Sequence, residues 1–166
     1  MNNTFQPCAR RVFLKHLGGL AMLWPLTLAG QDQPRPDPLK PEVVKDFVIK
    51  GHGDLDGVKR MLEEQPGLLN ATWDWGAGDF ETALGGAGHM GRPDIAEYLI
   101  QKGARMDLFV ATMLGKLEIV KGMTDAYPEL LQSRGPHKLS LIHHAEKGGS
   151  RAVEVLEYLK SKGLTK

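Results

Sequence analysis

The chain has 166 residues, of which 42% are hydrophobic, and carries a formal net charge of +1. This length and composition predict one domain, long enough to bury about two-thirds of the surface that the unfolded chain exposes. The nearly neutral charge balance argues against nucleic acid as the main partner, because a surface that binds nucleic acid needs an excess of basic side chains.

The first segment, residues 1–29, is predicted to be a signal peptide rather than part of the fold. Its stretch Ala9–Lys15, ARRVFLK, is similar to the twin-arginine export motif S/T-R-R-x-F-L-K, with Ala in the first place. The apolar run Leu17–Leu28 would form a helix of about 18 Å, too short for about 30 Å of hydrocarbon. Small residues at Thr27 and Ala29 favour cleavage after Ala29. The alternative is an amphipathic N-terminal helix that happens to contain two arginines.

Residues 30–41 are predicted to form an extended linker, because proline blocks helix formation. The prolines are Pro34, Pro36, Pro38 and Pro41. A proline-rich recognition motif is the alternative. The single cysteine, Cys8, lies in the segment to be removed, so the mature chain has no disulfide to form in an oxidising compartment. No stretch after residue 29 is apolar enough to span a membrane.

From residue 42 onward, hydrophobic spacing predicts pairs of short helices. The clearest case is Gly91–Arg105, where Ile95, Leu99 and Ile100 share one helical face and Gly103 follows as a C-terminal signal. The predicted helices span Glu42–Lys50, Leu55–Glu64, Thr82–Met90, Pro93–Lys102, Asp107–Leu114, Leu117–Ala126, Leu141–Lys147 and Arg151–Lys162.

The sequence pattern of the predicted helices recurs along the chain. IAEYLIQKG, which begins at Ile95, matches VLEYLKSKG, which begins at Val155, and Glu118–Lys121 fits a third copy. The equivalent positions Ile95, Ile119 and Val155 are 24 and 36 residues apart. A recurring unit of this size predicts stacked helix pairs.

A second recurring pattern precedes each of these helices. Its positions match T-P-L-H-x-A-A-x-x-G, the ankyrin signature: Thr82, Leu84, Ala87 and Gly91; Leu108, Ala111 and Gly115; Ser140, Ile142, His143, Ala145 and Gly149. The chain therefore resembles ankyrin-repeat proteins over residues 42–163. More narrowly, it resembles small exported bacterial members that carry a W-D-W-G…G-D-F/W-E-T-A-L run and a G-P-H run, here residues 73–84 and 135–137. The pattern departs at Ala83, Gly85, Met106 and Phe109.

The resemblance implies an all-α solenoid of about four helix pairs that binds a protein through its fingers and concave face. It implies no catalytic activity and no cofactor. The third unit lacks about nine residues of a normal repeat of about 33, whereas the loops 65–81 and 127–139, the first and second fingers, are long. We expect a notch between these fingers, floored by Arg105 and the starts of helices.

The first finger is rich in aromatic residues and supplies most of the candidate binding residues. The candidates are Trp73, Trp75, Asp79 and Phe80, with Arg105 at the floor and His137 in the second finger. We expect the two tryptophans to face different sides, one packed on the repeats and one free to meet a peptide or glycan. The alternative is that both simply close the core.

Histidines are the only hint of chemistry, and no metal-ligand motif such as H-E-x-x-H or C-x-x-C occurs. The resemblance places His143 at a structural position of the repeat. Gly85, Gly86 and Gly88 are predicted to allow close helix packing. We therefore predict a non-enzymatic binding or scaffold module in the periplasm or secreted through the twin-arginine pathway. The alternatives are a metal-dependent hydrolase using His137, His144 and Asp79, and an accessory subunit or chaperone of an exported redox enzyme.

Overall fold

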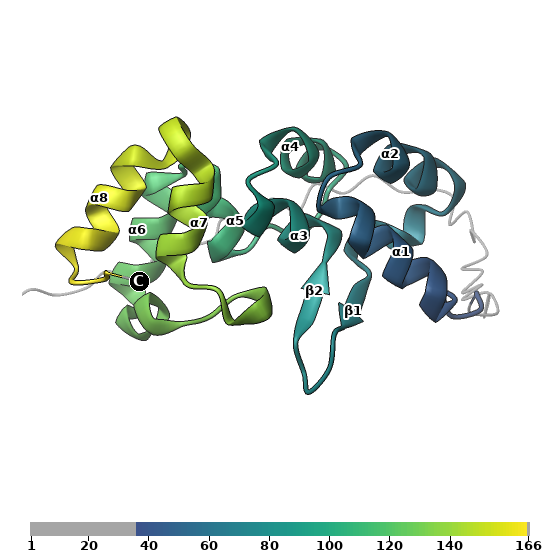
Figure 1. Ribbon diagram of the computed structural model, residues 1–166, viewed down its shortest axis with the longest axis horizontal. Helices are drawn as coiled ribbons and strands as arrows, with labels where there is room; N and C mark the ends of the chain where they lie inside the picture. Colours follow the sequence, from purple (N-terminus) through teal and green to yellow (C-terminus); the bar gives the residue numbers. More distant parts are fainter. Residues whose placement is uncertain (1–35, 166) are drawn as a thin grey trace, which may run out of the picture. The chain divides into compact units, whose positions relative to one another are not determined.

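The computed structural model describes residues 36–165 of the chain (Figure 1). The predicted signal peptide and residues 30–35 of the predicted linker lie outside these residues. The compact unit begins at Asp37, and Leu39 packs against the hydrophobic core. The domain therefore starts inside the segment that we predicted to be linker, because an apolar side chain in that segment has a core to pack on.

Helices account for 68% of the described residues and strands for 5%, so the predicted all-α class is confirmed. Every predicted helix is present, with ends within two residues of those predicted. The α-helices are α1 (Pro41–Gly51), α2 (Leu55–Glu64), α3 (Ala83–Met90), α4 (Pro93–Gln101), α5 (Leu108–Met113), α6 (Leu117–Ala126), α7 (Leu141–Gly148) and α8 (Val153–Ser161). Among the described helices, none is long and apolar enough to cross a membrane.

Four helices begin at a side chain that caps their first turn. The backbone N–H three residues further on donates a hydrogen bond to each cap, which is Asp54 at α2, Thr82 at α3, Asp107 at α5 and Ser140 at α7. Such caps satisfy N–H groups that have no partner inside the helix and contribute about 1 kcal/mol each. The recurring Thr or Ser position is thus a helix cap, and α5 is capped one residue later, at Asp107 rather than at Met106.

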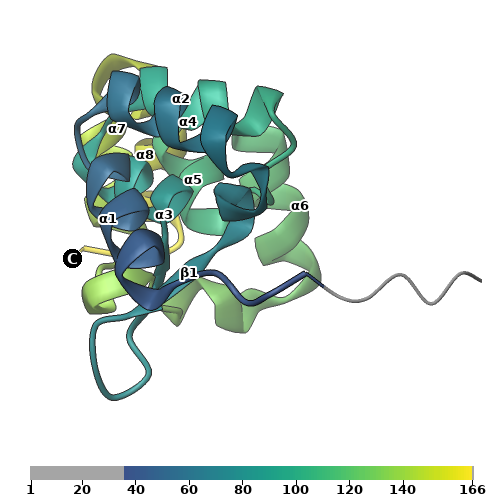
Figure 2. The same ribbon diagram turned by 90° about the vertical axis from the view of Figure 1, so that its right-hand side faces the viewer.

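The helices pack as two rows. In the first row α1 contacts α3, α3 contacts α5 and α5 contacts α7, and each packs on the helix that follows it in the chain. In the second row α2 contacts α4, and α6 contacts α8; Figures 1 and 2 show the pairs from two directions. The core lies between the rows, where Leu84, Ile95 and Leu99 are at most 2% exposed. Each such side chain contributes roughly 1.5–3 kcal/mol to folding.

Both fingers are long, and the link between α4 and α5 is short, as the spacing predicted. The first finger contains the 3-10 helix η1 (Pro66–Asn70) and a hairpin of β1 (Thr72–Asp74) and β2 (Phe80–Thr82). The hairpin is antiparallel and places Trp73 opposite Glu81. The second finger contains two 3-10 helices, η2 (Pro128–Gln132) and η3 (Pro136–Lys138), and a further one, η4 (Gly149–Ala152), precedes α8.

Contact between α1 and α3 depends on the absence of a side chain at Gly51. A Cβ there would meet the backbone of Ala83, with the Cα atom at only 2.6 Å. We predict that Gly51→Ala destabilises the protein by about 1–3 kcal/mol, because the helices must move apart.

Gly122, inside α6, has open space around it. Gly122→Ala should therefore stabilise the protein by about 0.5–1 kcal/mol through helix propensity alone. Chemical unfolding of both variants checks the signs; a stabilising Gly51→Ala would contradict this packing.

Candidate functional site

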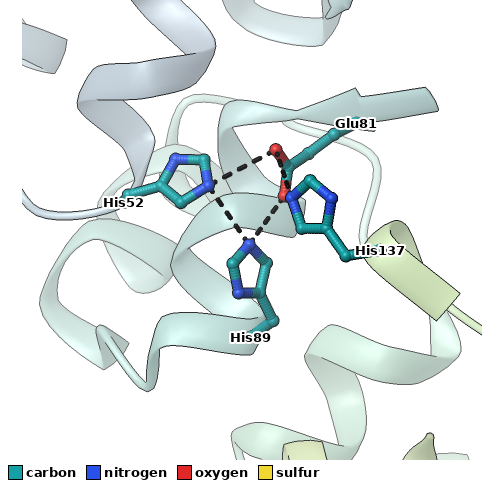
Figure 3. Close-up of side chains that lie close together, drawn as sticks. All are labelled: His52, Glu81, His89 and His137. Atoms are coloured by element: carbon teal, nitrogen blue, oxygen red, sulfur yellow. Dashed lines mark hydrogen bonds and ion pairs between the residues drawn. The ribbon is translucent and has the colours of Figure 1, made fainter. Parts of the chain in front are cut away.

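Four side chains from separate segments converge at one point (Figure 3). His52 follows α1, Glu81 lies on β2, His89 on α3 and His137 on η3. We call them the His–Glu cluster. The Nε2 atom of His89 lies 2.8 Å from Oε1 of Glu81 and 3.2 Å from Nε2 of His52. The Nε2 atoms of His52 and His137 lie 3.4 Å and 3.5 Å from Oε2 of Glu81. One ligand atom of each residue lies within 4.8 Å of one atom of every other.

The local sequence makes room for this arrangement. A Cβ atom at Gly86 of α3 would lie 2.9 Å from two atoms of the His52 ring, so only glycine leaves space for that ring. At Gly85 a Cβ atom would contact Pro136, the neighbour of His137, at 3.4 Å. Gly86 is thus steric, as predicted, but the space that it leaves holds a ring of the cluster, whereas the contact of a Cβ atom at Gly85 would be an ordinary van der Waals contact.

His137 reaches the cluster through an unusual backbone. Its φ is +56° and that of Lys138 is +59°, in the left-handed region that costs roughly 1–2 kcal/mol for a residue with a side chain. Asp79 of the first finger holds this conformation. Its carboxylate accepts hydrogen bonds from the backbone N–H of His137 at 2.8 Å and from the ring Nδ1–H at 2.9 Å. The second finger is thereby tied to the first.

Outer hydrogen bonds fix the orientation of two rings and of the carboxylate. Nδ1–H of His52 donates to the carbonyl oxygen of Val48 at 3.0 Å, and Nδ1–H of His137 donates to Asp79. Both acceptors lack a proton, so the Nδ1 atoms carry the hydrogens and the Nε2 atoms face the cluster. Nε1–H of Trp75 donates to Oε2 of Glu81 at 2.7 Å.

Glu81 is ionised inside the protein. Its side chain is 0% exposed, and this burial alone would raise the pKa of the carboxyl group. Hydrogen bonds from His52, His89 and Trp75 outweigh burial and lower the pKa to about 2. The hydrogen bond to Glu81 in turn raises the pKa of His52. The cluster is therefore a buried negative charge surrounded by three imidazoles, a donor set that can hold a proton or a divalent metal ion.

A groove lies between the two fingers. It encloses about 290 Å³. Its lining residues are Thr72, Gly78, Asp79, Phe80, Thr82, Gly85, Asp107, Phe109, Arg134, Gly135 and Pro136. Phe80 is 61% exposed. The expected notch is therefore present, but Arg105 is not among its lining residues. Arg105 donates its backbone N–H to Oδ1 of Asn70, and Asp107 and Phe109 take the floor position, because α5 begins beyond Arg105.

The remaining predicted site residues are divided between the core and the cluster. Trp73 packs against the hydrophobic core, and Trp75 bonds Glu81. One tryptophan packs on the repeats and the other is partly exposed, as we expected. The alternation of side chains does not explain this, because residues two apart in an extended chain share a face. Trp75 is 36% exposed, and its indole N–H donates to Glu81 rather than remaining free for a ligand.

The three residues of the hydrolase alternative do not come together. His137 and Asp79 are in contact, whereas His144 is only 1% exposed on α7 and donates from Nδ1 to the carbonyl oxygen of Ser140. The neighbouring His143 donates from Nε2 to the carbonyl oxygen of His89 at 3.0 Å. This contact between α7 and α3 agrees with the structural role predicted for His143.

Sequence reasoning missed His52, Glu81 and His89. These residues form no short motif, since the two histidines are 37 residues apart and meet only when α1 packs on α3. One signal was present: Gly51-His52 and Gly88-His89 repeat a Gly-His pair at the end of the first helix in two successive units. The two pairs are one residue out of register with each other, since Gly53 aligns with Gly91, so the signal is weak.

Comparison with known proteins identifies no relative: no family model matches the chain, no curated protein matches it, and no solved structure matches it.

Buried His144 makes stability depend on pH. Burial lowers its pKa from 6.5 to about 4, and its Nε2 has no partner among the described residues. As the pH falls, the His144 ring is therefore protonated in the unfolded chain before it is protonated in the folded protein. The contribution of neutral His144 to the free energy of unfolding is complete above pH 6.5 and is lost towards pH 4. We predict that the wild type loses about 2 kcal/mol more than His144→Gln between pH 7 and pH 5. Urea unfolding at both pH values measures the difference; equal losses would contradict the shift.

Proposed function

We propose that the protein is an exported ankyrin-type binding module that holds a segment of a partner protein in the groove and acts without catalysis. The recurring capped helix pairs and their two-row stack support the ankyrin assignment. The groove between the fingers is the observation that carries the binding proposal, since ankyrin-repeat proteins usually bind their partners through the fingers and the concave face.

The groove combines apolar surface with one free positive charge. Phe80 and Phe109 supply aromatic surface. The acidic side chains are already used, because Asp79 binds His137 and Asp107 caps α5. The guanidinium group of Arg134 has no hydrogen-bond or ion-pair partner within residues 36–165. Arginine and aromatic residues dominate the energy of protein interfaces. The partner is accordingly an exposed chain segment that carries a carboxylate beside an apolar side chain.

The volume of the groove agrees with this partner. Cofactors and drug-sized ligands occupy roughly 300–1,000 Å³, and the groove has about 290 Å³ and is open to solvent. A hollow of this size accommodates a few side chains of a peptide. Of the two other functions that the sequence left open, the hydrolase lacks its assembled residues. In the other alternative, an accessory subunit of an exported redox enzyme, that enzyme is the partner.

Photo-crosslinking tests the groove. Phe80→p-benzoylphenylalanine, in the full chain and in the periplasm of its host, should give one dominant crosslinked protein, because this ring is exposed in the groove. The matched control is the same substitution at Tyr127, which is 65% exposed and does not line the groove. With the purified partner, Arg134→Glu should weaken binding by at least about 10-fold. Equal crosslinking from both positions, or unchanged affinity of Arg134→Glu, would overturn the proposal.

Export through the twin-arginine route is tested separately. Replacing both Arg10 and Arg11 by lysine keeps the charge of the segment and removes the motif. We predict that the full chain then stays in the cytoplasm, while the wild type reaches the periplasm in a bacterial host. Cell fractionation measures the distribution, with Lys15→Arg as the control that leaves the arginine pair intact. Periplasmic accumulation of the double variant at the wild-type level would contradict this route.

A further inference from the structure

The His–Glu cluster has the dimensions of a four-coordinate metal site. In a tetrahedral Zn²⁺ site with bonds of about 2.0–2.1 Å, neighbouring ligand atoms lie about 3.3 Å apart. The separation of the Nε2 atoms of His52 and His89 is 3.2 Å, and Oε2 of Glu81 lies 3.4 Å and 3.5 Å from the Nε2 atoms of His52 and His137. The Nε2 atom of His89 lies 2.8 Å from Oε1 of Glu81, and all six pairs of ligand atoms lie within 4.8 Å. We propose that His52, Glu81, His89 and His137 bind one Zn²⁺ ion, through the Nε2 atoms and the Glu81 carboxylate.

The outer hydrogen bonds of the cluster are those that metal ligands need. A histidine that binds a metal usually donates its other ring N–H to a carboxylate or a carbonyl oxygen, which fixes its orientation. His137 does so to Asp79, and His52 does so to Val48. The ligating carboxylate is in turn held by Nε1–H of Trp75. When the two rings are neutral, each therefore has an Nε2 lone pair directed at the common centre.

Charge and ligand type favour Zn²⁺. Imidazole nitrogens with one carboxylate oxygen are ligands typical of zinc, whereas Mg²⁺ and Ca²⁺ prefer oxygen ligands alone. The carboxylates of Glu81 and Asp79 together balance the two positive charges of the ion. A buried carboxylate among three neutral imidazoles is thereby neutralised without protonating any of them.

The site is closed and joins distant parts of the fold. Four protein ligands complete a tetrahedral shell and leave no position for a reacting water, which is the arrangement of structural zinc sites. The ligands come from the end of α1, from β2, from α3 and from the second finger. The side chains of His52 and His137 are 25% and 35% exposed, which gives the ion a path from solvent. The ion therefore locks the second finger to the rest of the stack.

A metal-free network, in which a protonated histidine pairs with Glu81, is the competing arrangement. Metal analysis of the full chain, purified without a histidine tag, separates the two. We expect one Zn²⁺ per chain after desalting. A chelator should remove the ion and lower the melting temperature, and added Zn²⁺ should restore the original melting temperature. Substituted Co²⁺ should give the intense visible bands of a tetrahedral site. Less than about one ion in ten chains after incubation with Zn²⁺, or a weak octahedral Co²⁺ spectrum, would overturn the proposal.

Variants locate the ion. His137→Ala and Glu81→Gln should each lower Zn²⁺ affinity by more than about 100-fold, beyond the roughly 10–100-fold expected for the outer partner in Asp79→Asn. His143→Gln is the control, because His143 lies outside the cluster and the glutamine still has a side-chain hydrogen-bond donor. Circular dichroism verifies folding, and His137→Ala removes a ligand from a partly exposed loop rather than from the core. Unchanged affinity in His137→Ala, or an equal loss in His143→Gln, would exclude this site. Neither measurement requires a binding partner, so a failure of the metal-site proposal can be distinguished from a failure of the proposal that the groove binds a partner.

Discussion

The buried carboxylate of Glu81 is the constraint on which the arrangement of the candidate site depends. A charge with no exposed surface is stable only when partners surround it, and no single segment of this chain can supply them. Trp75 comes from the same hairpin, His52 and His89 from two stacked helices, and His137 from a finger that follows more than fifty residues later. Satisfying this one side chain therefore fixes the hairpin against the stack and the second finger against the hairpin.

The cluster and the groove share their walls. Asp79 and Phe80 precede Glu81 directly and line the groove, while Pro136 precedes His137 and lines it from the other side. A ligand set that holds Glu81 and His137 together thus also sets the width of the groove. We propose that two roles meet in one place: the closed site fixes the geometry, and the open surface beside it uses this geometry to bind.

Local sequence signals were sufficient for the helices and insufficient for the site. Periodicity such as that of Ile95 and Leu99 predicted every helix, because an amphipathic helix and its caps depend on residues within a few positions. Arg105 was misplaced because its surroundings depend on where α5 starts. The bond of Trp75 to Glu81 was not predicted because it depends on which face of the hairpin meets the stack. His52 and His89 were missed because only stacking joins them, although a Gly-His pair occurs at both positions.

Anomalous diffraction from crystals of the wild-type protein grown with Zn²⁺ tests the central claim most directly. Data on either side of the zinc absorption edge locate the ion independently of any assumption about its ligands. The account predicts one strong peak per chain, about 2.0–2.2 Å from the Nε2 atoms of the three histidines and from a Glu81 oxygen. Side chains of the cluster closed on one another with no peak between them, or a peak held elsewhere on the chain, would contradict it.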